Sequence, residues 1–266
     1  MDSTLRNNII CYEEGSRRPS EQELVGEEPL LIRIEDQPYS VVMRTPGEEV
    51  FHAAGFCLAE GLVDEPKDFA AIGHCVDLDP NVIDVRLVPE RRDEVSDLLE
   101  RRAFISQTSC GICGKELMKD LFQILTPNRD ETSINIDQAI ECVDRLGQHQ
   151  DLFKRTHASH AVMLFDSELE PLSMAEDVGR HNALDKAIGK VFMRSQLAKA
   201  RLAVLSSRIS YELVQKAARA HLPILIGMSN PTALAVELGS NLNMTLACAG
   251  KRKPGLTVFC GEERLS

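Results

Sequence analysis

Apolar residues recur with two different periods along this chain, and the change of period marks its organisation. From residue 27 to about 90, short β-rich runs dominate: "PLLIRIEDQPYSVVMRT" predicts two strands around the turn signal Asp36-Gln37-Pro38, and "AIGHCVDL" and "NVIDVRLVP" predict two more. A helix is expected between the pairs, because Val50, Ala54, Cys57 and Leu58 repeat at helical spacing. The pattern therefore predicts a small ββαββ unit.

The ends of that helix carry recognisable signals. Thr45 is expected to cap it, with Pro46 at the first helical position and Glu48 completing a capping box. Gly61 is expected to end it. The first 26 residues are polar and without a clear period, so they are predicted to form a mobile arm or an edge strand.

From residue 157 onward, strand and helix patterns alternate and predict a layered α/β domain. The expected strands are "SHAVMLFD", "LAVLSS", "PILIGMS", "NMTLACA" and "LTVFC", and the expected helices are "HNALDKAIGKVF", "YELVQKAARA" and "PTALAVELG". The first helix has an apolar stripe that is expected to pack on the face of the sheet. The stripe is formed by Leu184, Ala187, Ile188, Val191 and Phe192. We therefore divide the chain into a small α+β sub-domain at 27–105, a loop and helical connection at 106–156, and an α/β domain at 157–266.

Composition removes several classes of function. The formal charge of −11 and the isoelectric point near 5.2 argue against nucleic acid as a partner, since phosphate binding needs concentrated Lys and Arg. No apolar run is long enough to span a membrane, and no secretory signal pattern opens the sequence, so a cytoplasmic protein is expected. The eight cysteines are spread along the chain, which favours a reducing compartment and mostly buried thiols.

The stretch "QTSCGICGKEL" places Cys110 and Cys113 in a loop bounded by glycines. A zinc site needs a second pair of ligands, and the nearest candidates, His157 and His160, lie far along the chain at an expected strand entrance. No metal site is therefore predicted. A redox dithiol, an inactive structural pair and a sulfur-carrying thiolate remain open, and the exposed loop favours the carrier.

Two further regions could bind a ligand. The first comprises the carboxyl ends of two expected strands and a basic loop, and it indicates anion binding. Ser206 and Arg208 follow one expected strand and Ser229 follows the next, where helix N-termini favour phosphate, although Ser210 and Asn230 could simply be caps. The basic loop 250–255 supports the anion reading, with a solvated run of charge as its competitor.

The second region, "EDVGRHNALDKAIG", gathers polar residues around a helix start. We expect Arg180 and His181 to face a ligand. The competing interpretation is simpler: Asn182 could be the helix cap, Asp185 and Lys186 could be surface residues, and His181 could be a structural hydrogen-bonding group.

Five motifs, in order along residues 40 to 260, resemble the formate dehydrogenase accessory sulfurtransferases of the FdhD family. They are "VVMRTPGEEVFHAAGFCLAEGLV", "TSCGICG", "EDVGRHNALDKAIG", "SSRISYELVQKAARAHLPILIGMSNPTALAVELG" and "NMTLACAGKRKPGLTVF". The resemblance implies a cytidine-deaminase-like fold and transfer of sulfur from a cysteine desulfurase to the molybdenum or tungsten cofactor of formate dehydrogenase. The zinc signature of deaminases is missing from the sequence, so the fold brings no deaminase chemistry.

The resemblance also implies a set of site residues. Cys110 would carry the persulfide, and Cys113 is the second catalytic candidate, with its role left open. The bis(molybdopterin guanine dinucleotide) cofactor would be bound by a homodimer, and GDP would mimic part of it. The cofactor-binding loop would comprise Ala249, Gly250, Lys251, Arg252, Lys253, Pro254 and Gly255. The alternative is a chaperone that binds the cofactor without transferring sulfur.

Overall fold

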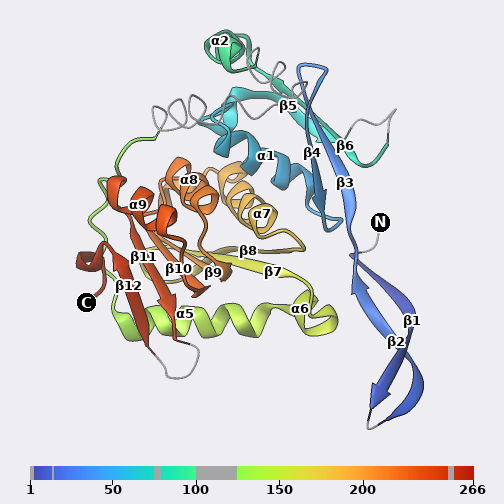
Figure 1. The fold of residues 1–266 in the computed structure, drawn as a ribbon. Helices are drawn as coiled ribbons and strands as arrows, with labels where there is room; N and C mark the ends of the chain where they lie inside the picture. The colour runs from blue at the N-terminus through green and yellow to red at the C-terminus, as the bar shows by residue number, and fades with distance from the viewer. Residues whose placement is uncertain (1–2, 14, 75–78, 100–124, 251–254) are drawn as a thin grey trace.

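In the part of the chain that the structure describes, the strands form three separate β-sheets, and helices pack on the two larger ones (Figure 1). The computed structural model describes residues 3–13, 15–74, 79–99, 125–250 and 255–266. Within these residues the chain forms a mixed α/β fold. No described helix has the length and apolarity that crossing a lipid bilayer requires.

The strands and the helix expected between residues 27 and 90 are present in the order predicted. The four-stranded sheet has the order β4-β3-β6-β5, with β3 at Glu28–Ile34, β4 at Gln37–Arg44, β5 at Phe69–His74 and β6 at Val82–Leu87. Helix α1 at Glu49–Ala59 connects the two hairpins, followed by the 3-10 helix η1 at Pro66–Asp68, and helix α2 at Pro89–Glu94 follows β6. Alternate residues of β3 are buried, so one face of this sheet packs on the core.

The start of α1 differs from the capping box expected from the sequence. The helix begins at Glu49 after a left-handed Glu48 (φ 66°), with no side-chain cap. Thr45 cannot cap it, because its Oγ1 accepts a hydrogen bond from the Val178 N–H (3.0 Å) and its own N–H donates to Asp177 Oδ2 (3.1 Å). Gly61, with φ 78°, terminates the helix as expected.

The second sheet has six strands in the order β12-β11-β10-β9-β7-β8. They are β7 at His160–Phe165, β8 at Pro171–Asp177, β9 at Leu202–Arg208, β10 at Ile224–Ser229, β11 at Thr245–Ala249 and β12 at Leu256–Cys260. Strands β9, β10 and β11 are parallel, whereas the other pairs are antiparallel. Strand β8 was not anticipated, because its exposed and half-buried positions leave a weak alternating pattern.

Helices cover both faces of this sheet (Figure 1). On one face lie α7 at Arg180–Met193, α8 at Tyr211–Arg219 and α9 at Ala233–Asn241, and on the other lies α5 at Ile136–His149 beside α6 at Asp151–Thr156. Two further short 3-10 helices are η2 at Leu197–Lys199 and η3 at Glu262–Arg264. The predicted stripe of α7 is confirmed, since all five of its residues are buried.

The larger core runs continuously from the four-stranded sheet through α1 and α7 to the six-stranded sheet. Glycines permit the close crossing of the two helices: a Cβ at Gly55 would lie 1.9 Å from the Asp185 carbonyl oxygen, and one at Gly189 would lie 1.9 Å from that of Phe51. A smaller core fills the opposite face, under α5. The boundaries at 105 and 156 stay a prediction.

The N-terminal residues, predicted to be a mobile arm or an edge strand, form a two-stranded hairpin. Strands β1 at Thr4–Glu13 and β2 at Ser16–Val25 pair with each other along their whole length and with no other described strand. This hairpin, which we call the arm, projects away from the body (Figure 1). Its strands are mostly polar on both faces, so no alternating apolar signal revealed them.

Candidate functional site

The carboxyl ends of the parallel strands form one edge of the six-stranded sheet. Arg208 of β9 is in register with Ser229 of β10, and Gly227 of β10 with Cys248 of β11. The predicted anion residues Arg208, Ser229 and Ala249 are therefore brought together at this edge. Ligands of α/β sheets bind at such carboxyl edges, beside the starts of the following helices.

Arg180 and His181 reach the same edge from the start of α7. His181 Nε2 lies 3.2 Å from Ser210 Oγ and 2.9 Å from Glu212 Oε2, which places it against the start of α8. Arg180 carries a buried Nε without a hydrogen-bond partner. A buried guanidinium nitrogen that lacks an acceptor is suited to an anionic ligand.

The electrostatics of this corner favour neutral histidines. Burial lowers the pKa of His181 to about 4, and although Glu212 opposes the shift, the Arg180 charge adds to it. The pKa of His160, at the start of β7, is lowered by burial and then by Arg180. Both rings are therefore uncharged near neutral pH, and the positive charge at this edge comes from arginine.

A cavity of about 330 Å³ opens beside these groups, and sequence reasoning missed it. It is lined by Gln150, Phe153, His157, Ala158, Ser159, His160, Ser206 and Met228. Ser206 Oγ accepts a hydrogen bond from the Ala161 N–H (2.9 Å), which fixes the hydroxyl between β9 and β7. The antiparallel placement of β7 beside β9, which brings His160 to the carboxyl edge, could not be read from spacing alone.

The predicted cofactor-binding loop is the turn between β11 and β12. Ala249 is paired with Leu256, and the Gly250 N–H donates to the Gly255 carbonyl oxygen (2.9 Å), so the two ends of the loop are held together. Gly255 has a φ of +152°, which favours glycine. Lys251, Arg252, Lys253 and Pro254 lie outside the described residues.

Three polar residues of α7 have roles other than those expected. Asn182 is not the helix cap, since α7 begins at Arg180; its Nδ2 donates to the Met43 carbonyl (2.7 Å) and to Asp177 Oδ1 (2.9 Å). Asp185 and Lys186 are buried rather than at the surface. They were misread because their partners come from distant elements.

Lys186 and Asp185 each form a buried ion pair. Lys186 Nζ lies 2.7 Å from Asp177 Oδ2 and donates to the Thr45 carbonyl (2.8 Å), and Asp185 Oδ2 lies 2.7 Å from Lys216 Nζ. Burial raises the pKa of Asp185 to about 6, against the effect of Lys216. These contacts tie α7 to the N-terminal unit and to α8 behind the sheet edge.

Cys110 and Cys113 lie outside the described residues. Of the described cysteines, Cys57, Cys142 and Cys248 are buried, as expected for packing residues. Burial raises the pKa of Cys57 strongly and that of Cys142 to about 11, so both are thiols at neutral pH and poor nucleophiles. Within the described part of the chain, no three His, Cys, Asp or Glu side chains are grouped to hold a metal.

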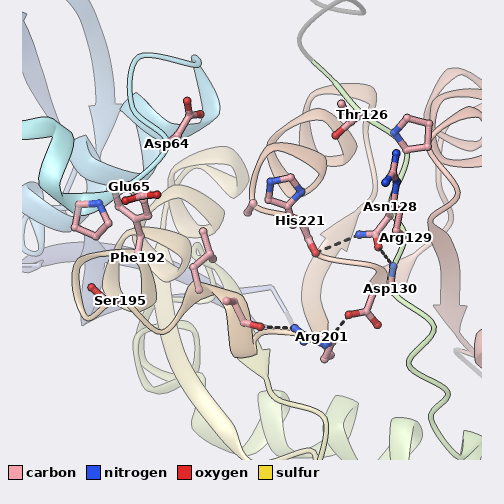
Figure 2. A pocket seen from close by; sticks show the side chains of 15 residues that line it. Asp64, Glu65, Thr126, Asn128, Arg129, Asp130, Phe192, Ser195, Arg201 and His221 are labelled. Atoms are coloured by element: carbon pink, nitrogen blue, oxygen red, sulfur yellow. Dashed lines mark hydrogen bonds and ion pairs between the residues drawn. The ribbon is translucent and has the colours of Figure 1, made fainter. Parts of the chain in front are cut away.

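A second cavity, of about 1110 Å³, lies at the opposite end of the same strands (Figure 2). Arg201 immediately precedes β9, and its Nε lies 2.8 Å from Asp130 Oδ2, while Asn128 Nδ2 donates to the His221 carbonyl (3.2 Å). Thr126 lines this cavity shortly after the described chain resumes at Leu125.

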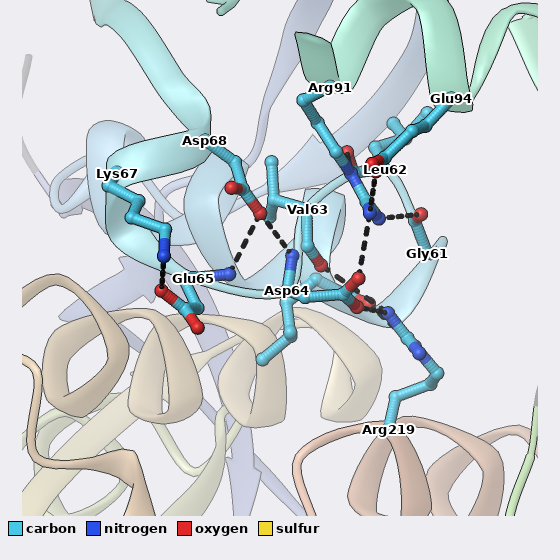
Figure 3. A network of polar contacts seen from close by, with 11 residues as sticks. Gly61, Leu62, Val63, Asp64, Glu65, Lys67, Asp68, Arg91, Glu94 and Arg219 are labelled. Atoms are coloured by element: carbon cyan, nitrogen blue, oxygen red, sulfur yellow. Dashed lines mark hydrogen bonds and ion pairs between the residues drawn. The ribbon is translucent and has the colours of Figure 1, made fainter.

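Ion pairs fix the position of Asp64, which lines this cavity. Asp64 lies 2.7 Å from an Arg219 nitrogen and 2.8 Å from an Arg91 nitrogen (Figure 3). Burial tends to raise the pKa of Asp64, but the hydrogen bond and charge of Arg219, followed by Arg91, lower it overall. The loop after α1 is thus fastened to both α2 and α8.

Comparison with known proteins identifies the family. The chain is 34% identical over 273 residues to a Streptomyces coelicolor protein named "Sulfur carrier protein FdhD", covering 99% of this chain and 96% of that protein. It is 36% identical over 255 residues to a Mycobacterium tuberculosis protein of the same name, covering 91% of each.

The fold is also shared. A crystal structure of a formate dehydrogenase accessory protein from Desulfotalea psychrophila matches with a TM-score of 0.78 at 20% identity, over the full length of both chains. The model of the FdhD/NarQ family matches residues 25–266. The resemblance inferred from the motifs is confirmed, and the chain belongs to the FdhD/NarQ family.

Proposed function

We propose that this protein is a sulfurtransferase that carries sulfur on Cys110 for the maturation of formate dehydrogenase. The observation that carries the proposal is the 34–36% identity, over nearly the whole chain, to proteins named as sulfur carriers. The raised thiol pKa values of Cys57 and Cys142 are consistent with it, because they make these two buried cysteines poor sources of a thiolate.

In the loading step, the Cys110 thiolate attacks the outer sulfur of a persulfide on a cysteine desulfurase. A sulfur–sulfur bond forms on Cys110, the bond in the donor breaks, and the desulfurase leaves as a thiolate, so the step needs no external oxidant or reductant. Release follows when the Cys113 thiolate attacks the inner sulfur of the persulfide. The products are a Cys110–Cys113 disulfide and hydrosulfide. Oxidation of the two cysteines to the disulfide supplies the two electrons that reduce the outer sulfur.

The acceptor in this proposal is the molybdenum or tungsten bis(molybdopterin guanine dinucleotide) cofactor of formate dehydrogenase, bound as cargo. Arg180, Arg208 and the start of α9 after Ser229 offer donors to its phosphates at the sheet edge. The loop 249–255 would extend this surface. The layering of helices on both faces of the six-stranded sheet supports the cytidine-deaminase-like arrangement that we propose for this domain.

We place this chemistry in the cytoplasm, where desulfurase and unfinished dehydrogenase are available. The test is activation of formate dehydrogenase in a strain that lacks the endogenous carrier. The Cys110→Ala variant is expected to give no active dehydrogenase while still binding GDP, because a loop thiol contributes little to packing. Full activation by this variant would support the alternative, a chaperone that binds the cofactor without moving sulfur.

A further inference from the structure

The turn at the start of α7, residues 177–182, is held by the N-terminal unit, which comprises the four-stranded sheet and α1. Helix α7 begins at Arg180, and no side chain caps it. Asp177 and Asn182 are residue types that commonly cap helices, yet both bond to the N-terminal unit. Arg180 and His181 lie within this turn, so its conformation decides where these two side chains stand.

The carboxylate of Asp177 is the centre of the turn, and it is fully buried. Its Oδ1 accepts hydrogen bonds from the Gly179 N–H (2.8 Å) and from Asn182 Nδ2 (2.9 Å). Its Oδ2 accepts a hydrogen bond from the Thr45 N–H (3.1 Å) and lies 2.7 Å from Lys186 Nζ. A buried carboxylate with two partners on each oxygen has its acceptor positions filled, and the chain around it is therefore held in one conformation.

Thr45 bonds to this part of the chain with all three of its polar groups. Its N–H donates to Asp177, its Oγ1 accepts from the Val178 N–H (3.0 Å), and its carbonyl oxygen accepts from Lys186 Nζ (2.8 Å). Thr45 is also buried, with 2% of its surface exposed. Any effect of Thr45 on a ligand must therefore pass through the residues of the turn.

We infer that Thr45 is a positioning residue of the cofactor site: its hydroxyl holds the turn in the conformation that presents Arg180 and His181 at the sheet edge. The inference rests on the proposed function, because it takes these two residues to bind the cargo. It gives the N-terminal unit a part in binding at a sheet to which it does not belong. Holding the binding groups in place before the ligand arrives raises affinity, because less ordering remains to be done on binding.

Isothermal titration with GDP tests the role of the hydroxyl. Thr45→Val keeps the size of the side chain and both main-chain bonds, but it leaves the Val178 N–H without its acceptor. The dissociation constant for GDP is expected to rise about five- to tenfold, because apparent affinity falls with the fraction of molecules in the binding conformation. Thr45→Ser restores the hydroxyl and should bind GDP nearly as tightly as the wild type.

Thr245→Val is the matched control, because it removes another buried threonine hydroxyl at the amino end of β11, where Oγ1 donates to the Gly261 carbonyl (2.6 Å). It should lower the free energy of unfolding without changing GDP affinity. Equal GDP affinity in the wild type and Thr45→Val, or equal weakening by Thr45→Val and Thr245→Val, would overturn this inference alone. A wild type that does not bind GDP would overturn the cofactor site and this inference together.

Amide hydrogen exchange of the wild type, followed by NMR, needs no variant and so does not depend on whether one folds. Coupling between two sites is reciprocal, so bound GDP must stabilise the contacts of Thr45 with the turn. Saturating GDP is expected to slow exchange of the Thr45 N–H about fivefold or more. The Leu87 N–H, which donates to Glu35 Oε1 (2.8 Å) in the same unit, should exchange equally with and without GDP. An unchanged rate at Thr45, or equal slowing at Leu87, would overturn the inference.

Discussion

Arg208 is an exposed cation at the carboxyl edge of β9, and it has no ion pair within the described parts of the chain, although acidic residues outnumber basic ones by 41 to 30. An exposed guanidinium without an ion pair can donate hydrogen bonds to a phosphate. Loss of a charge-assisted hydrogen bond costs about 1.5–3 kcal/mol, so Arg208→Gln is expected to weaken GDP binding roughly ten- to a hundredfold in isothermal titration.

The matched control is Arg194→Gln, which removes the same charge from the far end of α7 and should leave GDP affinity unchanged. If Arg208→Gln binds GDP as tightly as the wild type, then Arg208 does not contact the diphosphate. The triple alanine variant of Lys251, Arg252 and Lys253 tests the neighbouring loop in the same titration, and it is expected to bind GDP more weakly.

Cys113 is assigned the release of sulfur rather than its capture. The Cys113→Ala variant is therefore expected to form the persulfide normally but to activate formate dehydrogenase only partly, because an external thiol can make the same attack more slowly. Added dithiothreitol should restore most of the activity. A variant that cannot be loaded with sulfur, or that dithiothreitol does not rescue, would contradict this division of roles.

The crossing of α1 and α7 depends on glycine. Because a Cβ at Gly55 or Gly189 would meet a backbone carbonyl at 1.9 Å, Gly55→Ala and Gly189→Ala must push the helices apart. Each is expected to lower the free energy of unfolding by about 2–4 kcal/mol, measured by urea denaturation.

Gly147, inside α5, provides the comparison, because a Cβ there would meet nothing within 4 Å. Gly147→Ala is expected to raise the free energy of unfolding by about 0.5–1 kcal/mol, through the better helix propensity of alanine. Similar effects at Gly55 and Gly147 would show that the close crossing is not a constraint on stability.

Regular elements with strong periodicity could be predicted from the sequence, and elements without it could not. The stripe of α7 and the strands from β9 to β12 were found because burial on a face imposes a period. Strand β8 was missed, and the pairing of the arm into a hairpin was not predicted, because their faces are mixed. The capping box at Thr45 failed because Val178 and Asp177, more than a hundred residues away, occupy its hydrogen-bonding groups.

The candidate site was predictable in part for the same reason. Spacing placed Ser206, Arg208 and Ser229 at the ends of strands, and parallel pairing brings such ends together. His160 and its cavity depend on which strand lies beside β9, and sequence alone does not specify that neighbour. Asp185 and Lys186 looked like surface residues, because charge suggests exposure until a buried partner is known.

The joint between the N-terminal unit and the α/β body contains His52, a fully buried histidine of α1. Burial holds its pKa well below 6.5, and the nearby charges of Lys186, Lys216 and Arg44 act in the same direction. Below pH 6.5 the unfolded chain therefore binds a proton that the folded chain does not, so the free energy of unfolding decreases as the pH falls.

Two other groups with shifted pKa values, His181 and Asp185, have opposite effects. His181, with its pKa lowered to about 4, adds to the acid loss, whereas Asp185, with its pKa raised to about 6, stabilises the fold as the pH falls below 6. In wild type, urea denaturation at pH 7.5 and 5.5 should show lower stability at pH 5.5. His52→Leu should reduce this pH dependence by about one proton, up to 1.4 kcal/mol per pH unit.

The exposed His74 supplies the control for this measurement, because His74→Gln should keep the pH dependence of the wild type. If His52→Leu and the wild type lose stability equally between pH 7.5 and 5.5, then the buried ring does not control acid sensitivity.

Across the whole molecule, the two cavities lie at opposite ends of the parallel strands. The groups that we propose to bind phosphate are at the carboxyl ends, and the chain that follows the Cys-x-x-Cys segment lines the cavity at the amino ends. Between them, the buried ion pairs of Lys186 and Asp185 join α7 to its neighbours. The proposed cofactor site and the residues that follow the Cys-x-x-Cys segment therefore both belong to the six-stranded domain, at opposite ends of its parallel strands.

The most direct test of the sulfur-carrier account is mass spectrometry of the protein after incubation with a cysteine desulfurase and cysteine. The account predicts a gain of about 32 Da, one sulfur atom, on the peptide that contains Cys110. The gain should be removed by dithiothreitol, retained in Cys113→Ala and lost in Cys110→Ala. A peptide that gains no sulfur under conditions where the desulfurase itself is loaded, or equal labelling of the Cys110→Ala variant, would contradict the account.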